Sequence, residues 1–417
     1  MVITETLPSG LRLLTEAMPH VRSVSVGVWL TRGSRHESDQ QSGVAHFVEH
    51  MLFKGTTSRT AQQIAQTIDS IGGQLDAFTA KEYASYYIKV LDEHLPIAIE
   101  LLSDMVLHPA MAPADVAREQ SVILEEIKMV EDAPDDLVHE VFVQQFWSRH
   151  PLGRPILGTP ETVSSFESAG LLDYFRRTYI APNLIIAAAG NLDHARLRAL
   201  VQDGFADLAT GDAAEPTMPP AVTPGVALRE KDIEQSHLCL GTPAYPQAHD
   251  ERHAVYVLNT ILGGSMSSRL FQKIREERAL AYAVMSHLTA YSDAGMITVY
   301  AGCATEKVDE VVDLTLAELR ALRADPVPDE ELRRAKDHLK GSLMLSLENT
   351  SSRMSHLVRQ EIYFGRHVTL DEMLDGIERV TAEQVQRVAA DLFRGDAVAT
   401  LVGPPQSSGL EPQRLRI

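Results

Sequence analysis

Three side chains that can bind a metal ion or move a proton lie close together in the stretch 43–53. If this stretch is a helix, with about 100° per residue, His46, Glu49 and His50 share one side and apolar residues cover the remainder. A helix that is apolar almost all round is usually buried, and Ser42 stands where its N-cap is expected. Because burying two imidazoles and a carboxylate without partners is costly, the pattern predicts a ligand for this side.

A metal ion suits these two histidines. Side chains at positions i and i+4 of a helix project in parallel, so His46 and His50 can reach one Zn²⁺. Glu49 can then accept the proton of a water molecule held by the metal. The order His-x-x-Glu-His is the reverse of the commoner zinc-protease motif. The alternative is a pair of hydrogen-bonded histidines beside a solvated glutamate on a helix edge.

A catalytic zinc site takes three protein ligands and leaves a fourth position for water. The segment 113–130 has the apolar period of an amphipathic helix, with Glu119 and Glu126 at the edge of the apolar stripe and Glu125 facing water. Glu126 is therefore the candidate third ligand. Glu119, two turns earlier, is placed to hydrogen-bond a ligand. Ordinary glutamates at the border of the stripe are the alternative.

Length, charge and cysteine content limit the classes of protein. A chain of 417 residues is long enough for two domains with cores of their own. Its formal net charge of −19 argues against nucleic acid and anionic membranes as partners. Cys239 and Cys303 form no C-x-x-C pattern, which fits a reducing compartment. We find no secretory signal, transit peptide or membrane-spanning run, and therefore expect a cytoplasmic protein.

The expected elements occur twice in the same order. Residues 208–226 are rich in Ala, Pro, Gly and Thr, and they read as a linker between 1–207 and 227–417. Each half has a strand, a helix, aromatic-rich strands, a helix with an acidic start and a final strand. This order predicts an α+β fold of two tandem homologous units, each a mostly antiparallel sheet covered by helices on one face. The second half lacks the histidine pair, so we expect one Zn²⁺ per chain, in the first half.

The motif His46-x-x-Glu49-His50, followed by Glu126 within the sequence Ile-Leu-Glu-Glu-Ile, resembles the pitrilysin/insulinase family of zinc metallopeptidases, the inverzincins. The chain length resembles the branch that contains mitochondrial processing peptidase and its bacterial relatives. The resemblance covers nearly the whole chain.

Further matches lie in both halves, in the segments 72–79 and 262–271. In the family, an arginine and a tyrosine at the spacing of Arg275 and Tyr282 contact the substrate backbone. One departure is Asp76, where many relatives have asparagine, and it puts in question how this neighbourhood handles the substrate.

The resemblance implies a zinc-dependent endopeptidase that hydrolyses peptides or extended precursor segments in an enclosed chamber. Glu49 would act as general base on the zinc-bound water. The substrate would add as a strand to an exposed sheet edge at 75–79, so that Ala77 and Phe78 contact it. An acidic chain could favour peptides with Lys or Arg, but the sequence does not distinguish precursor processing from peptide clearance.

Larger members of the family carry four such units in one chain, with zinc in the first unit and the Arg/Tyr pair in the last. Two copies of this chain would complete the same set, which predicts a homodimer with composite sites. A heterodimer with a related chain is the alternative assembly. A non-catalytic peptide-binding or assembly subunit of the same fold is the alternative function. A structural zinc site is less favoured, because such sites usually have four protein ligands, often including Cys.

Overall fold

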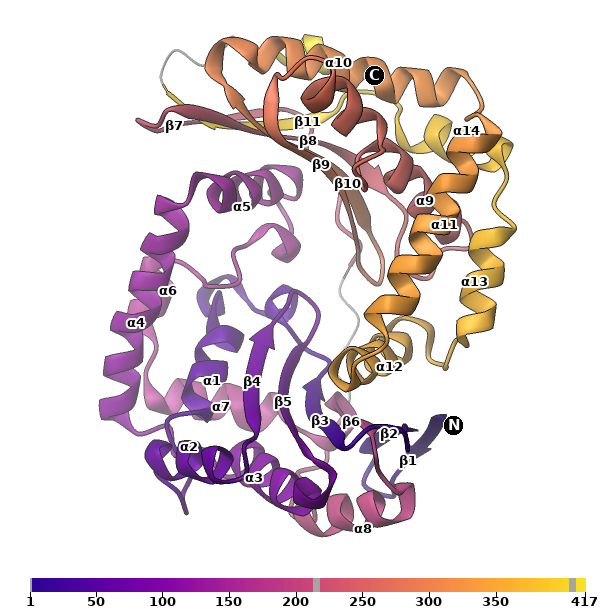
Figure 1. Cartoon of the computed structure of the whole chain (residues 1–417). Helices are drawn as coiled ribbons and strands as arrows, with labels where there is room; N and C mark the ends of the chain where they lie inside the picture. The colour runs from indigo at the N-terminus through magenta and orange to yellow at the C-terminus, as the bar shows by residue number, and fades with distance from the viewer. Residues whose placement is uncertain (1, 213–217, 405–409) are drawn as a thin grey trace. The chain divides into compact units, whose positions relative to one another are not determined.

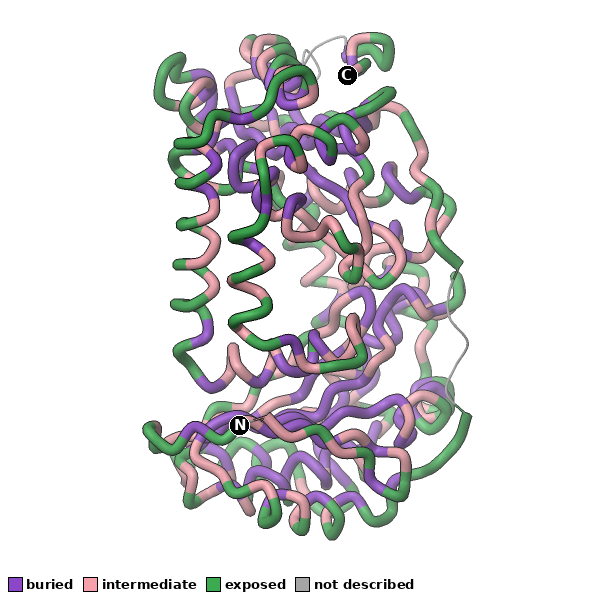
Figure 2. Tube along the Cα trace, turned by 90° about the vertical axis from the view of Figure 1, so that its right-hand side faces the viewer, coloured by how far each residue is buried: buried purple, intermediate pink, exposed green. Residues whose placement is uncertain are grey.

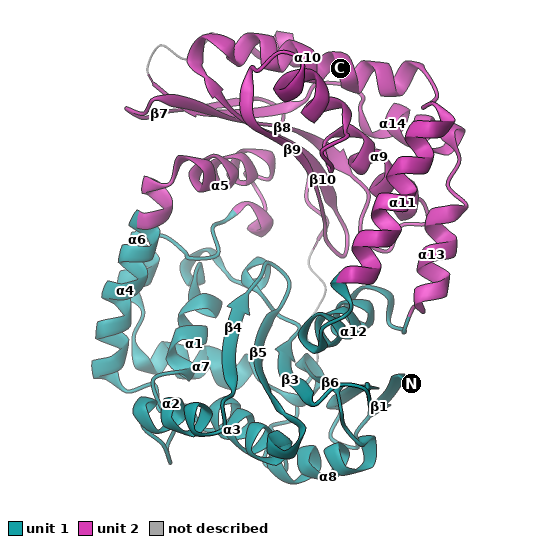
Figure 3. Ribbon diagram, viewed as in Figure 1, with its two compact units in different colours: residues 1–128, 154–217, 346–367 teal, residues 129–153, 218–345, 368–417 magenta. Residues whose placement is uncertain are grey.

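The computed structural model describes residues 2–212, 218–404 and 410–417 (Figure 1). It divides the chain into two compact units (Figure 3). Unit 1 comprises residues 1–128, 154–217 and 346–367, and unit 2 comprises residues 129–153, 218–345 and 368–417. Part of the expected linker, 213–217, lies outside the described residues. Each unit thus contains one segment that comes from the other half of the sequence.

Unit 1 is built on a six-stranded sheet in which one pair of neighbours is parallel and the others are antiparallel. In spatial order the strands are β1 (Val2–Thr6), β2 (Arg12–Ala17), β6 (Leu184–Gly190), β3 (Ser23–Leu30), β5 (Ala84–Leu91) and β4 (Gln74–Thr79). The parallel pair is β2 with β6. Strand β4 has a neighbour on one side only, so it is an edge of the sheet.

Helices of unit 1 cover one face of this sheet. They are α1 (Val44–Leu52), α2 (Ala61–Ser70), α3 (Leu95–Leu107), α4 (Pro113–Asp132), α6 (Pro160–Ser165), α7 (Ser168–Thr178) and α8 (His194–Gly204). The alternating residues Val24, Val26 and Val28 of β3 belong to the same buried cluster as Phe47 and Met51 of α1. This packing fixes which side of α1 faces the sheet.

Unit 2 repeats the arrangement with a five-stranded sheet in the order β7 (Val226–Glu230), β11 (Val398–Gly403), β8 (Gln235–Ala244), β10 (Gly295–Ala304) and β9 (Ala281–Ala290). Its parallel pair, β7 with β11, corresponds to β2 with β6, and β9 occupies the edge position of β4. The helices are α9 (Arg252–Leu262), α10 (Val308–Ala324), α11 (Asp329–Ser346), α13 (Leu370–Glu378) and α14 (Ala382–Leu392). The predicted α+β fold of two homologous units is confirmed.

The two halves exchange one helix each, which the sequence did not predict. Helix α5 (Pro134–Phe146) follows α4 in the chain but packs against β8 and β11 of unit 2, where Phe142 and Phe146 share a buried cluster with Cys239. Helix α12 (Thr350–Phe364) follows α11 but packs against β3 and β6 of unit 1, where Met354 contacts the cluster of Trp29. Each sheet therefore also carries a helix on the face that we expected to be open.

Buried residues are concentrated in the strands and in the helix faces against them (Figure 2). Cys239 and Cys303 are both buried in this core as free cysteines. Among the described residues, no helix combines the length and the apolar character needed to cross a membrane.

Candidate metal centre

Helix α1 presents the motif residues from a buried position. Its apolar side chains are buried, as the sequence predicts, and His46 and His50 remain partly accessible. The start of the helix differs from the expectation, because the N-cap is Gly43 rather than Ser42 and no N-cap side chain bonds to the helix. The carboxylate of Glu37 instead accepts hydrogen bonds from the Gly43 and Ala45 backbone N–H groups, each at 2.8 Å.

His46, His50 and Glu126 converge on one point. Nε2 of His46 lies 3.8 Å from Oε2 of Glu126, and Nε2 of His50 lies 3.6 Å from Oε1 of the same carboxylate. The two imidazole centroids are 4.6 Å apart. These separations are too long for hydrogen bonds, so the three groups approach one another without bonding directly. Within the described part of the chain, this is the group of His, Cys, Asp or Glu residues with the spacing of metal ligands.

Burial acts on the ring of His46, and a hydrogen bond orients the ring of His50. Burial, together with the neighbouring His50, lowers the pKa of His46 to about 3, so its ring is neutral near pH 7. Nδ1 of His50 lies 3.0 Å from Oε2 of Glu119. Because a carboxylate only accepts, Nδ1 of His50 donates to Glu119, and Nε2 is the ring nitrogen that faces Glu126.

An ion pair between Glu119 and Lys54 supports His50 on the side away from Glu126. Glu119 is buried, and its second carboxylate oxygen lies 2.7 Å from Nζ of Lys54. The ammonium group stabilises the ionised carboxylate, which in turn orients the His50 ring. The helix positions expected for α4 also hold, because the side chain of Glu125 is 68% exposed whereas that of Glu126 is 34% exposed.

Glu49 lies beside the convergence point on the same helix. Its carboxylate accepts a hydrogen bond from Oγ1 of Thr79 in β4. Burial is the largest influence on its pKa and raises it, while the bond from Thr79 and the charge of His50 oppose the rise. A carboxylate with a raised pKa is a stronger base, so Glu49 is suited to accept a proton.

The edge strand β4 offers unpaired backbone groups next to Glu49. Just after β4, the Ala80 N–H donates to the Tyr83 carbonyl at 2.8 Å. In an antiparallel pair, residues that bond to the neighbouring strand alternate with residues whose backbone groups point away from it. The N–H and C=O groups of Leu75, Ala77 and Thr79 therefore point away from β5 toward the free edge. The Ala77 N–H is held at 2.8 Å by Oδ1 of Asp76.

The side chains of β4 divide between the two faces of the sheet. Ala77 packs against the core that contains α1. Phe78 lies on the other face, 37% exposed, with its ring edge-on to Trp29. On that face the Tyr87 hydroxyl donates to Oδ2 of Asp76 at 3.1 Å. Phe78 is thus accessible next to the strand edge where a peptide would add.

Arg275 and Tyr282 lie side by side in unit 2. Arg275 belongs to a π-helical turn, η6 (Phe271–Glu276), and Tyr282 belongs to the edge strand β9. The guanidinium carbon is 5.0 Å from the Tyr282 ring centroid, a cation–π distance. Tyr282 is 79% exposed, so it lies outside the core.

Sequence reasoning missed three residues that support the site, namely Glu37, Lys54 and Thr79. Thr79 could have been found, because it alternates with Ala77 on the strand face that meets α1. Lys54 and Glu37 carry no comparable signal in the sequence. The partner of Lys54 is Glu119 on another helix, and the partners of Glu37 are backbone groups at the start of α1, beyond a loop.

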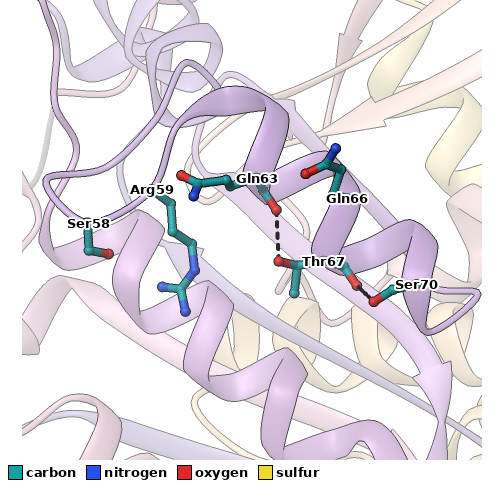
Figure 4. Close-up of a pocket in the computed structure, with 6 residues that line it drawn as sticks. All are labelled: Ser58, Arg59, Gln63, Gln66, Thr67 and Ser70. Atoms are coloured by element: carbon teal, nitrogen blue, oxygen red, sulfur yellow. Dashed lines mark hydrogen bonds between the residues drawn. The ribbon is translucent and has the colours of Figure 1, made fainter.

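A separate polar hollow of about 500 Å³ lies along α2 (Figure 4). It is lined by Ser58, Arg59, Gln63, Gln66, Thr67 and Ser70. Arg59 is already paired with Glu100 and Asp104, and Thr67 and Ser70 donate to backbone carbonyls of their own helix. None of the candidate site residues lines this hollow.

The donor set fits a zinc ion. Bond lengths of about 2.0–2.2 Å place the ligand atoms of a tetrahedral zinc site about 3.3–3.5 Å apart. Here one ligand atom from each of the three residues lies within 4.8 Å of the others, and the separations to the two Glu126 oxygens are 3.8 and 3.6 Å. Two imidazoles and one carboxylate match the three-ligand set of catalytic zinc sites, and the Glu49 carboxylate lies nearby. The arrangement fits a metal-dependent hydrolase.

Comparison with protein families agrees with this class. The family described as "Insulinase (Peptidase family M16)" matches residues 12–160, and "Peptidase M16 inactive domain" matches residues 165–339. The chain belongs to peptidase family M16.

Relatives match over almost their entire length. The chain is 41% identical to "Uncharacterized zinc protease YmxG" of Bacillus subtilis, over 97% of this chain and 98% of that protein. It is 43% identical to an "Uncharacterized zinc protease" of Mycobacterium tuberculosis, over 99% and 95%. Among solved structures, a "peptidase M16 inactive domain from Pseudomonas fluorescens" has the same fold, with a TM-score of 0.91, 22% identity, and coverage of 98% and 99%.

Proposed function

We propose that the protein is a zinc-dependent endopeptidase that hydrolyses peptides or extended precursor segments. The observation that carries the proposal is the convergence of two imidazoles and one carboxylate on one point beside Glu49. Relatives named zinc proteases support the same metal and reaction class.

His46, His50 and Glu126 would hold one zinc ion per chain, with Glu119 orienting His50. When bound, zinc lowers the pKa of water and polarises a substrate carbonyl. Glu49 accepts the proton of the attacking water at a carboxylate oxygen and delivers it to the leaving amine nitrogen. Thr79 orients the Glu49 carboxylate through its hydroxyl.

The substrate would pair with the free edge of β4. Its backbone would bond to the outward N–H and C=O groups at Leu75, Ala77 and Thr79, a mode that gives affinity with loose side-chain selectivity. Phe78 is exposed beside this edge and would contact a substrate side chain. The family resemblance further supports a homodimer that encloses the substrate. In this homodimer Arg275 and Tyr282 would contact the backbone of the substrate. A cytoplasmic location stays a prediction.

The test compares Glu49→Gln with wild type. The variant should bind one zinc ion per chain but lose about 100-fold or more of the turnover of a peptide library, because a positioned general base contributes at least that much. Glu126→Gln should lose zinc as well as activity. Glu125→Gln, on the exposed side of α4, is the matched control and should keep both.

Retained turnover in Glu49→Gln would exclude Glu49 as the base. Wild-type protein that binds peptides but neither holds zinc nor cleaves them would instead support the non-catalytic subunit. Mass spectrometry of the library products also tests whether cleavage favours peptides with Lys or Arg.

A further inference from the structure

The start of α1 is held by a side chain from outside the helix. The first N–H groups of a helix have no partner within it, and here the N-cap residue is Gly43, which has no side chain to offer. Glu37, which follows the 3₁₀ turn η1 (Ser34–His36), accepts from the Gly43 and Ala45 N–H groups with both of its carboxylate oxygens. A carboxylate at this end also interacts favourably with the helix dipole.

Close backbone packing fixes the segment just before the helix. Gly43 has φ of +93°, and a Cβ at this position would lie 2.7 Å from the Leu157 carbonyl oxygen. Gly158, with φ of +78°, packs equally closely against the Ser42 carbonyl oxygen, which also accepts a 2.7 Å hydrogen bond from Oγ1 of Thr162. The helix therefore begins at a defined place against the 157–162 segment.

Glu37 is itself buried and held in place. Nη2 of Arg154 donates to the Glu37 backbone carbonyl at 2.8 Å, and Nζ of Lys81 donates to the Arg154 carbonyl. Burial raises the pKa of Glu37 to about 7, opposed by the bonds from Ala45 and Gly43 and by the charges of Arg154 and Lys81. A buried carboxylate kept against this cost indicates a specific role for its two bonds.

The bond to Ala45 acts on the residue directly before His46. Helix α1 has nine residues, and His46 lies in its first turn while His50 lies in its last. A loosened first turn would move His46 relative to His50 and Glu126. We propose that Glu37 is a positioning residue that fixes the first turn of α1 and so holds His46 in the metal centre. This inference rests on the proposed zinc site.

The experiment measures metal binding rather than activity. Glu37→Gln keeps the shape of the side chain but places an amide NH₂ opposite one of the two backbone N–H groups. Its zinc dissociation constant should rise about tenfold or more, which is typical when a partner that orients a metal ligand is lost. The visible absorption spectrum of the cobalt-substituted variant should also change, because it reports the coordination geometry.

Asp193→Ala is the matched control. Asp193 caps α8 in the same unit by accepting from the Arg196 N–H at 2.8 Å. Its loss should lower the melting temperature but leave zinc affinity and the cobalt spectrum as in wild type. Glu37→Ala should show a larger effect than Glu37→Gln, and if Glu37→Ala does not fold, the Gln variant decides.

Folded Glu37→Gln with wild-type zinc affinity and cobalt spectrum would overturn the positioning role, even if its melting temperature falls. Wild-type protein that binds no zinc would overturn the metal centre itself and this inference with it. The two failures are distinguishable because the first leaves wild-type binding intact.

Discussion

At the scale of single residues, the two nitrogen atoms of the His50 ring have different partners in the candidate metal centre. His50 directs Nε2 at Glu126 and bonds through Nδ1 to Glu119, which is paired in turn with Lys54. The buried Glu119 needs this ammonium group, because an ionised carboxylate without a partner is costly in the interior. The charge of Lys54 is thereby coupled to the orientation of His50, a candidate metal ligand.

Lys54→Met tests this coupling. Without the ammonium group the buried Glu119 carboxylate loses its ion-pair partner and holds the His50 ring less firmly, so zinc affinity should fall by several-fold up to about tenfold. Competition with a chelator measures it. Lys54→Arg should retain most of the affinity, and Lys128→Met, which removes an exposed lysine paired with Glu125, should leave it unchanged. Wild-type affinity in Lys54→Met would contradict the coupling.

At the scale of elements, the edge strand β4 links the metal helix to the proposed substrate. Thr79 of β4 bonds to Glu49 of α1, while the outward backbone groups of β4 lie along the free edge of the sheet. Asp76 occupies one of those groups, the Ala77 N–H, and is itself held by Tyr87. A peptide that adds to this strand must displace the Asp76 carboxylate from that N–H group.

Asp76→Ala removes this competitor. The KM for an extended peptide should fall by about 2- to 10-fold, since a net hydrogen bond contributes about 0.5–1.5 kcal/mol, while kcat changes little. Steady-state kinetics measures both constants. Gln74→Ala, at an exposed position on the same face of β4, serves as the control. An unchanged or higher KM in Asp76→Ala would show that Asp76 does not compete with substrate.

At the scale of the whole molecule, two duplicated units have diverged in chemistry. Unit 1 holds the candidate metal ligands on α1 and α4, whereas unit 2 exposes Arg275 and Tyr282 at the corresponding edge strand. The proposed homodimer would combine the zinc ligands of one subunit with Arg275 and Tyr282 of its partner. One polypeptide supplies both sets, so a symmetric dimer would contain two equivalent sites.

A mixing experiment tests the shared site. Homodimers of Glu49→Gln and of Tyr282→Phe should each be impaired. Exchange of their subunits should restore one intact site per heterodimer and about half of the activity of a dimer with two sites. Peptide cleavage before and after exchange measures the recovery, and mass spectrometry verifies that heterodimers have formed. Proven heterodimers without recovery would refute a site shared between subunits.

The sequence by itself determined features that depend on neighbours along the chain. Helical periodicity placed His46, Glu49 and His50 on one side of α1 and separated Glu125 from Glu126 on α4, because a helix fixes the angle between its own residues. The repeated order of elements likewise predicted two homologous units. The family resemblance supplied the pairing of Glu126 with the histidines before any contact was seen.

Tertiary structure decided the contacts between elements distant in sequence. In the folded chain Glu37, and not the expected Ser42, binds the N–H groups at the start of α1. Folding also brings Lys54 to Glu119 and places α5 and α12 each on the sheet of the other half. The capping rule failed because it considers only the residue next to the helix, whereas any buried acceptor within reach can satisfy the same N–H groups. Periodicity identifies the face that a helix buries, but packing selects the surface that covers it.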